Sequence, residues 1–390
     1  MSNAGQPTSV HEVIVVGLGA WGAAAAHDLA RSGHRVLAID QYGHPHPYGS
    51  SHASTRVYRE ADTGGSIYVP FAVESLPAFR QLEEEFGLRL FQRMGAVYLS
   101  DRADGNHART IADYREHDRP FEELDAREVA RRWPLISAPD EYVAIYEEAA
   151  GALFAERLVQ TLHKAAQARG AELRFSERVL DWSETPSGVE VTTDRGHYEA
   201  EQLVLCLGPW LEETGRLGLP MVVERQVPVW FDTSTEPTAR ELPIYLAPAE
   251  PPAENIYVIP DVLGDGIKAT MHRGGVRGRR AELADEPEPA DVEYVRENLR
   301  RISPALAAHP VARSLICRYT NTPDLHWIVG RHPEFDSVVV IGGDGGRGMK
   351  FVPFIGRAAT SLVSREPRPD LAPFDPRRFA ATSVVTRTRF

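Results

Sequence analysis

Cysteine is scarce in this 390-residue sequence, which contains only Cys206 and Cys317. Two cysteines so far apart offer neither a disulfide framework nor the closely spaced ligands of a zinc site, and we expect no metal. Sparse cysteine use is typical of a reducing compartment. The first 11 residues also lack the basic, apolar and small-residue zones of a secretory signal, so we expect a cytoplasmic protein.

Long apolar runs and an excess of positive charge are missing as well. The longest stretch without a polar side chain covers residues 13–26, which is shorter than the about 20 apolar residues that a membrane-spanning helix needs. Lys and Arg number 43 against 55 Asp and Glu, and the net charge is −12. Because nucleic acids and anionic membranes bind basic surfaces, we expect neither as a partner.

A glycine motif is present in residues 12–40, where an apolar strand, the pattern Gly17-x-Gly19-x-x-Gly22, an Ala-rich helix, a second strand and Asp40 follow in order. In a dinucleotide-binding fingerprint the first glycine permits a tight turn, the second lets the backbone approach a pyrophosphate, and the third lets the helix pack on the strand. The acid would bind a ribose. This order favours the fingerprint over a glycine-rich turn without a ligand, but it does not separate NAD from FAD.

The segments after this unit differ in regularity. Residues 42–59 are polar, too irregular for a strand or a helix, and long enough to reach into a site. Helical spacing follows at 68–86. A short strand at 97–99 and a helix near 127–133 belong to a part of the chain that is typical of an insertion.

The middle of the chain contains two further patterns. Between 156 and 207 we expect a helix and several strands that return to the nucleotide-binding sheet, the last of which is the apolar strand 203–207 with Cys206 inside it. Residues 226–319 contain short strands joined by Pro-rich loops, which predicts an antiparallel domain.

Near the C-terminus, the strand 338–341, a glycine turn at 342–348 and an apolar helix near 351–363 repeat the order of the N-terminal unit. This chain would build its nucleotide domain from both ends and the middle, with a second domain inserted. That plan resembles the plan of the glutathione-reductase-like flavoproteins. The expected fold class is α/β, or α+β overall, with a Rossmann FAD-binding domain formed by 1–88, 150–222 and 320–390 and an antiparallel β-sheet substrate domain formed by 89–149 and 223–319.

Six strings in register resemble the monomeric sarcosine oxidase and N-methyltryptophan oxidase family, within the D-amino-acid-oxidase-like superfamily. They are GSSHASTRVYR at 49–59, YVP at 68–70, RWP at 132–134, IKATMH at 267–272, CRYT at 317–320 and GRGMKF at 346–351. The resemblance implies FAD and the oxidation of a secondary or primary amine beside a carboxylate to an imine. It also implies O2 as the electron acceptor, hydrogen peroxide as its product, and a monomer.

Cys317 is similar to the family's cysteine that is joined by a thioether to the flavin ring. The alternative is a small buried apolar residue, the commonest role of a free cysteine and the one we expect for Cys206.

Arg59 and Lys350 resemble the pair that holds the substrate carboxylate. A guanidinium offers a planar fork to a carboxylate and an ammonium adds a point charge, whereas surface or ion-paired cations are the alternative.

Arg56 and Lys268 resemble basic residues set against the flavin, with oxygen activation implied at Lys268. Positive charge there would stabilise the reduced flavin and superoxide, and a structural ion pair is the alternative. His272 and Tyr319 resemble side chains of the substrate pocket. The His could tune the protonation of the amine, or it could be hydrogen-bonded structure.

The resemblance also implies positions for further site residues. Tyr257 and Asp344 are expected at the substrate, and the additional cofactor contacts are Ser51, His52, Thr55, Val179, Gly208, Trp210, Gly346 and Gly348, together with Arg56 and Lys350.

Three positions depart from the family pattern by the loss or gain of an acid. Ser54 replaces the acid of the family's Asp-Thr-Arg string, Asp344 stands where sarcosine oxidase has an apolar aromatic residue, and Asp62 stands where it has a tyrosine. Two added acids near the pocket favour a substrate with a further positive or hydroxyl group over sarcosine itself.

Three other functions remain open from the sequence. A flavin dehydrogenase on the same fold would pass electrons to a quinone or a protein, and a flavin-binding module would have no turnover. The combination of Arg59, Lys350, Lys268 and Cys317 speaks against the module. A nicotinamide dehydrogenase is a weaker alternative, because nothing resembles a hydride-transfer pocket for that cofactor.

Overall fold

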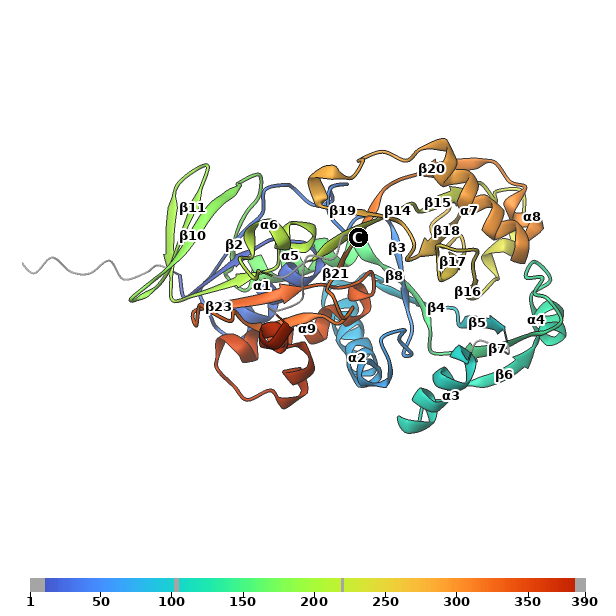
Figure 1. The fold of residues 1–390 in the computed structure, drawn as a ribbon, viewed down its shortest axis with the longest axis horizontal. Helices are drawn as coiled ribbons and strands as arrows, with labels where there is room; N and C mark the ends of the chain where they lie inside the picture. The colour runs from blue at the N-terminus through green and yellow to red at the C-terminus, as the bar shows by residue number, and fades with distance from the viewer. Residues whose placement is uncertain (1–10, 102–104, 219–220, 383–390) are drawn as a thin grey trace, which may run out of the picture.

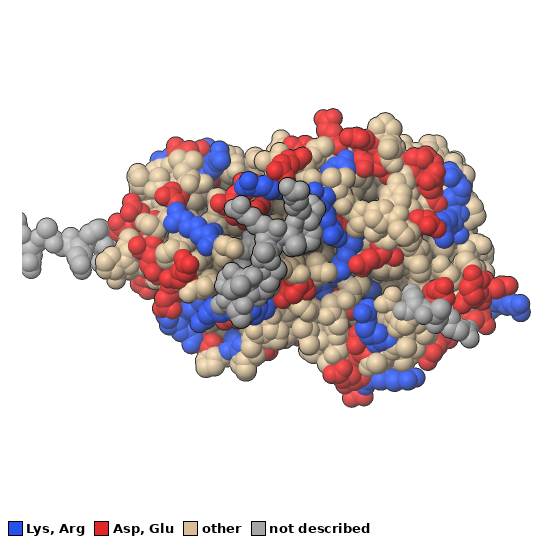
Figure 2. All heavy atoms as spheres, in the orientation of Figure 1, with Lys and Arg blue, Asp and Glu red and all other residues tan. Residues whose placement is uncertain are grey.

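The computed structural model describes residues 11–101, 105–218 and 221–382. Figure 1 shows a six-stranded sheet with its helices in one half of the molecule and an eight-stranded sheet in the other. In the described residues no helix is long and apolar enough to cross a membrane. Figure 2 shows acidic and basic side chains mixed over one face, without a continuous basic surface there.

The six-stranded sheet has the order β22-β23-β13-β1-β2-β9. Its strands are parallel except for the pair β22 and β23. Fully buried Val, Ile and Leu runs form the central strands, as expected for parallel strands covered on both faces. The strands are β1 (Val13–Val16), β2 (Val36–Ile39), β9 (Glu172–Arg174), β13 (Gln202–Leu205), β22 (Ile328–Arg331) and β23 (Val338–Gly342).

Different layers cover the two faces of this sheet. On one face the core joins the strands to three helices, α1 (Ala20–Arg31), α5 (Ala155–Ala168) and α9 (Val352–Val363). Four consecutive alanines, 23–26, let α1 approach both other helices closely. The other face packs on a small antiparallel sheet of β10 (Val179–Thr185), β11 (Gly188–Thr193) and β12 (His197–Ala200).

The eight-stranded sheet is antiparallel apart from the parallel pair β16 and β5. One of its faces packs on three helices, α4 (Ala126–Arg132), α7 (Pro289–Ile302) and α8 (Pro304–Ala307). In sheet order the strands are β20 (Val311–Ser314), β15 (Val229–Phe231), β18 (Ile267–His272), β17 (Asn255–Ile259), β16 (Ile244–Pro248), β5 (Ala96–Asp101), β7 (Tyr142–Glu147) and β6 (Glu122–Asp125).

Two three-stranded sheets and the remaining helices complete the described part of the chain. The sheets are β3 (Thr55–Tyr58), β8 (Gly151–Phe154) and β4 (Phe91–Arg93), and β19 (Val276–Gly278), β14 (Val222–Gln226) and β21 (Cys317–Asn321). The helices are α2 (Val69–Phe86), α3 (Asn106–Glu116), α4 (Ala126–Arg132), α6 (Leu211–Thr214), α7 (Pro289–Ile302) and α8 (Pro304–Ala307). Short 3-10 helices are η1 (Ser66–Tyr68), η2 (Gly208–Trp210), η3 (Pro237–Arg240), η4 (Arg280–Glu282), η5 (Gly348–Phe351), η6 (Pro369–Phe374) and η7 (Pro376–Thr382).

Several local expectations are corrected. The stretch 42–59 is not wholly irregular, because residues 55–58 form β3, which pairs with β8 far along the chain. Cys206 lies just after β13 rather than inside a strand, although its N–H still bonds the Val16 carbonyl at 2.8 Å. The division of the chain into two domains stays a prediction; its boundaries near 222 and 319 lie in β14 and β21, which pair with each other.

The first and third glycines of the N-terminal motif are required by backbone contacts. Gly17 has φ +92°, and a Cβ there would lie 2.3 Å from the Cys206 carbonyl oxygen. A Cβ on Gly22 would lie 1.7 Å from the Gly17 carbonyl oxygen. Gly22 therefore allows α1 to close on the turn after β1, as the fingerprint predicts.

Candidate active site

A cavity of about 880 Å³ is lined by residues of both large sheets. Part of its wall comes from the loops that follow β1, β2, β13 and β23. Strands β3, β5, β10, β16, β17, β18 and β21 also contribute to it. Ligands of open α/β sheets bind at the carboxyl ends of the parallel strands, and the cavity lies at those ends.

The glycine turn and Asp40 form one end of the cavity. Gly17 and Gly19 line it where α1 begins. Asp40 follows β2, and its carboxylate accepts hydrogen bonds from the Leu18 N–H at 2.6 Å and the Tyr42 N–H at 2.8 Å. The start of a helix and an ordered carboxylate thus face the same space, which suits a pyrophosphate and a ribose.

Most of the other residues expected at the cofactor also line the cavity. These are Ser51, His52, Arg56, Val179, Gly208, Trp210, Cys317, Gly346, Gly348 and Lys350. Gly22 and Thr55 do not, because Gly22 packs under the glycine turn and Thr55 is buried behind the wall. Gly22 thus has the packing role that the fingerprint gives to its third glycine, and Thr55 lies outside the cavity lining.

The segment 50–52 reaches the glycine turn from the other side. The Ser51 hydroxyl accepts a hydrogen bond from the Ala20 N–H at 2.9 Å, which satisfies an amide in the first turn of α1. His52 Nε2 lies 2.6 Å from the Ile316 carbonyl oxygen, while its buried Nδ1 has no partner in the described residues. Burial, followed by the charge of Arg56, lowers the pKa of His52 to about 3, so the ring is neutral at physiological pH.

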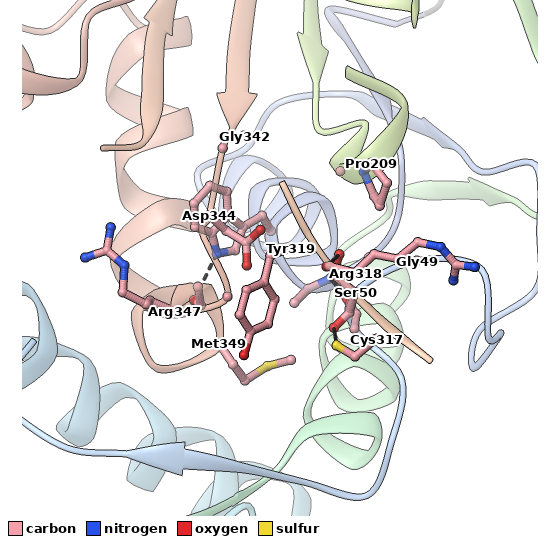
Figure 3. Close-up of a pocket in the computed structure, with 18 of the residues that line it drawn as sticks. Gly49, Ser50, Pro209, Cys317, Arg318, Tyr319, Gly342, Asp344, Arg347 and Met349 are labelled. Atoms are coloured by element: carbon pink, nitrogen blue, oxygen red, sulfur yellow. Dashed lines mark hydrogen bonds between the residues drawn. The ribbon is translucent and has the colours of Figure 1, made fainter. Parts of the chain in front are cut away.

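Cys317 and Arg56 meet in the cavity wall. Cys317 is a free, buried cysteine, and its sulfur lies 3.5 Å from Arg56 Nη2. The same guanidinium donates hydrogen bonds to the carbonyls of Ser50 at 2.9 Å and His52 at 2.7 Å, so its position is fixed. Cys317 and Tyr319 alternate with Arg318 along β21, and Figure 3 shows Arg318 extending away from Tyr319.

Lys268 lies behind this wall rather than in it. Its ammonium donates a hydrogen bond to the Thr55 carbonyl, which also accepts one from Arg56, and it lies 5.5 Å from the centre of the Trp230 ring. Burial, followed by the nearby Arg56, lowers the pKa of Lys268 well below its usual range. The structure therefore places Arg56 between Lys268 and the cavity.

His272, Tyr319 and Tyr257 line the opposite end of the cavity. His272 Nδ1 lies 3.5 Å from the Tyr319 hydroxyl, and the buried Nε2 has no partner in the described residues. Burial and then the positive charges of nearby arginines lower the pKa of His272 to about 3. Burial also raises the pKa of Tyr257 to about 12. This end therefore presents a neutral imidazole and neutral phenols.

Arg59 and Lys350 are brought together, but they differ in their partners. Lys350 Nζ donates to the carbonyls of Arg59 at 3.0 Å and Ala61 at 2.8 Å, and it lies 3.0 Å from Asp62 Oδ2. Two of its ammonium hydrogens thus go to backbone carbonyls, and Asp62 adds an ion pair. The Arg59 guanidinium lies 5.2 Å from the centre of the Tyr98 ring and has no ion pair in the described residues. It is the cation of this pair that remains available to a ligand.

The two acids that depart from the family pattern have different environments. Asp62 is paired with both Lys350 and Arg347. Burial alone would raise its pKa, but these two cations hold the pKa of Asp62 well below its usual range. Asp62 therefore lies at the pocket as expected from the sequence, but its charge is balanced by these two cations. Asp344 has no ion pair in the described residues, and burial raises its pKa to about 6.

Three residues of this end were missed by sequence reasoning. Arg347 belongs to the GRGMKF string, but the sequence predicted no role for it. Its guanidinium lies 4.7 Å from the centre of the Tyr68 ring and donates a hydrogen bond to the Leu325 carbonyl at 2.7 Å. Tyr98 and Glu147 lie on neighbouring strands, and no motif marks either of them. Within the described ranges, no group of His, Cys, Asp and Glu is arranged to hold a metal ion.

Comparisons with known proteins agree with this geometry. The family model described as FAD dependent oxidoreductase matches residues 12–362. Monomeric sarcosine oxidase of Streptomyces avermitilis is 34% identical over 380 residues, which is 95% of this chain and 98% of that protein. N-methyl-L-tryptophan oxidase of Yersinia pestis is 30% identical over 376 residues, or 95% of this chain and 99% of that one.

A solved structure extends the comparison to the fold. NikD, an unusual amino acid oxidase essential for nikkomycin biosynthesis, has a TM-score of 0.81 with this chain at 23% identity. The match covers 98% of this chain and 100% of NikD. At this identity the likeness concerns the fold.

Proposed function

Because the chain belongs to the FAD-dependent oxidoreductase family, with monomeric sarcosine oxidase and N-methyl-L-tryptophan oxidase among its relatives, we propose that it is an FAD-dependent oxidase of an amino acid or a related secondary or primary amine. When bound, FAD would accept the two electrons released as the C–N bond becomes an imine, and O2 would carry them away as hydrogen peroxide.

The observation that carries the proposal is the continuity of the cavity. It extends from the glycine turn at Gly17 and Gly19, past Cys317, to Arg59 and His272. A dinucleotide would be held at the first end and an amino acid at the second. The residues fit FAD because the turn has no room for a side chain at Gly17, the helix start faces the cavity, and Asp40 follows β2.

Cys317 is the residue that would hold the flavin covalently, by a thioether from its sulfur. Three features support this role: the sulfur lines the cavity, it has no disulfide partner, and Arg56 lies 3.5 Å from it. Arg56 is also the cavity-lining cation that would face the cofactor there, with Lys268 behind it.

The substrate end supports an amine that carries a carboxylate. Arg59 would bind the carboxylate through its planar fork, and Lys350 would add positive charge from its place beside Asp62. The unpartnered Nε2 of neutral His272 is available to hydrogen-bond the amine without adding a like charge. Oxidation needs the neutral amine, so a neutral neighbour suits the reaction.

Three finer aspects of the proposal have support of their own. One relative carries the name monomeric, which supports a monomer here. Two free cysteines support a reducing cytoplasm. Asp344, with its raised pKa and no ion pair, supports a substrate with a second positive or hydroxyl group.

The carboxylate anchor is tested by the variant Arg59→Met, with flavin absorbance followed under anaerobic conditions. For an amino-acid substrate we expect the half-saturating concentration to rise by about tenfold to several-hundredfold, the range for a lost charge-assisted hydrogen bond of about 1.5 to 3 kcal/mol. The methyl ester of the same substrate should be poor on the wild type and change little. Arg109→Met is the control, because Arg109 also lines the cavity but is exposed and bonded to Asn106 at 2.9 Å. Equal use of acid and ester by the wild type would contradict the anchor and favour a simple amine.

A further inference from the structure

Arg59 needs a fixed position to recognise a carboxylate, yet its guanidinium contacts no acid in the described part of the chain. The side chain lies over the Tyr98 ring, with Cζ 5.2 Å from the ring centre. A guanidinium over an aromatic face is held by the negative charge of that face. The orientation of the Tyr98 ring therefore sets where Arg59 can lie.

Glu147 fixes that ring. It stands at the end of β7 beside β5, which carries Tyr98. Its Oε2 accepts hydrogen bonds from the hydroxyls of Tyr98 and Tyr114, each at 2.5 Å. Glu147 is fully buried and has no cationic partner in the described ranges, so its carboxyl group depends on hydrogen-bond donors such as these two hydroxyls.

The same carboxyl group also reaches the backbone next to Arg59. Glu147 Oε1 accepts a hydrogen bond from the Glu60 N–H at 2.8 Å. Glu60 itself is fixed by Arg119, whose Nε and Nη2 bond its carboxylate at 2.6 and 2.7 Å. One buried carboxyl group thus holds both the ring beneath Arg59 and the peptide that follows it.

From this arrangement we propose that Glu147 is a positioning residue for substrate recognition, acting on Arg59 through Tyr98 and through the Glu60 amide. The inference rests on the proposed function, in which Arg59 binds the substrate carboxylate. Glu147 touches no substrate. Its role is to keep the guanidinium in one orientation before the substrate arrives, so that less ordering accompanies binding.

The chain offers a matched pair of variants for the test. Tyr98→Phe and Tyr114→Phe each remove one hydroxyl from the same oxygen of Glu147, and both rings are buried. The Tyr98 ring is the one over which Arg59 lies. A merely structural role of Glu147 predicts equal effects of the two substitutions on ligand binding, whereas a positioning role predicts an effect of Tyr98→Phe alone.

The probe is methoxyacetate, a carboxylate without an amine, titrated into the flavin-containing protein by calorimetry. We expect Tyr98→Phe to weaken methoxyacetate binding by about threefold to thirtyfold, the range for a residue that affects the ligand through another side chain. Tyr114→Phe should change the affinity by less than about twofold. Glu147→Gln should weaken binding at least as much as Tyr98→Phe. With an amino-acid substrate, Tyr98→Phe should raise the half-saturating concentration while the limiting rate of flavin reduction stays within about twofold.

Two outcomes separate this inference from the function on which it rests. If Arg59→Met binds methoxyacetate as tightly as the wild type, the carboxylate anchor itself is wrong. If Arg59→Met weakens binding but Tyr98→Phe does not, or if Tyr114→Phe weakens it as much as Tyr98→Phe, the anchor stands and the positioning role of Glu147 is overturned.

Discussion

The ammonium nitrogen of Lys350 lies 3.0 Å from Oδ2 of Asp62, inside the cavity that also contains Arg59. Burial lowers the pKa of Lys350 to about 8, while Asp62 opposes that shift. Lys350 is therefore charged below pH 8 and neutral above it. We expect methoxyacetate affinity to be constant between pH 6.5 and 7.5 and to fall by roughly fivefold toward pH 9. This loss corresponds to about 1 kcal/mol of attraction between the Lys350 ammonium and the ligand carboxylate.

The variant Asp62→Asn checks the assignment of this pH dependence. Without Asp62, the contribution that raises the pKa of Lys350 is lost, so the break in affinity should move below pH 8. Lys350→Met should remove the break. A break at the same pH in Lys350→Met would assign the titration to another group.

Asp344 should produce a separate pH dependence. Burial raises its pKa to about 6, so it gains its negative charge as the pH rises through that value. For a substrate with a second positive group, the half-saturating concentration should fall between pH 5 and pH 7. Asp344→Asn should flatten this part of the profile, and a substrate without a second polar group should show no such change. An unchanged profile in the variant would remove Asp344 from substrate binding.

Attachment of the flavin through Cys317 predicts that acid-precipitated protein stays yellow. Cys317→Ser should release the flavin into the supernatant, whereas Cys206→Ala, the control at the other buried cysteine, should leave the pellet coloured. Because the thioether withdraws electron density from the ring, the Cys317 variant should also be a poorer oxidant when it binds FAD. A colourless wild-type pellet from flavin-containing protein would contradict the linkage.

Lys268 is tested through the two half-reactions. If its charge assists the reaction with oxygen, Lys268→Met should slow reoxidation of the reduced protein by O2 far more than anaerobic reduction by substrate. The expected factor is about 10² to 10³, as for one lost electrostatic stabiliser. Equal slowing of both half-reactions would instead assign Lys268 a structural role, through its hydrogen bond to the Thr55 carbonyl.

Local patterns were enough to predict the first strand, glycine turn and helix, and their repeat at the C-terminus. In both places the signal lies in adjacent residues: a buried apolar run, glycines at fixed spacing, and a periodic helix. Strand β3 was missed because its regularity comes from pairing with β8, about 100 positions away, and the polar residues around it hide that pairing.

The candidate site likewise contains residues that local motifs predict and contacts that they do not. The expected cations were found near the cavity, but their partners depend on contacts that no motif contains. Lys350 is held by the segment 59–62, some 290 positions earlier, and Lys268 is held by the carbonyl of Thr55. Tyr98 and Glu147 are ordinary strand residues in the sequence. Their importance follows only from the way β5 and β7 place them beside Arg59.

The proposed oxidase activity is tested most directly by turnover of a substrate panel by the purified protein. N-methyl, cyclic and primary amino acids, including members with a second positive or hydroxyl group, are mixed with it anaerobically while flavin absorbance is recorded, and air is then admitted. We expect at least one amino acid to bleach the flavin, and air to restore its colour with one hydrogen peroxide formed per amine oxidised. Bleaching that only a quinone or protein acceptor reverses would make the protein a dehydrogenase. A flavin that no amine reduces would contradict the proposed oxidase.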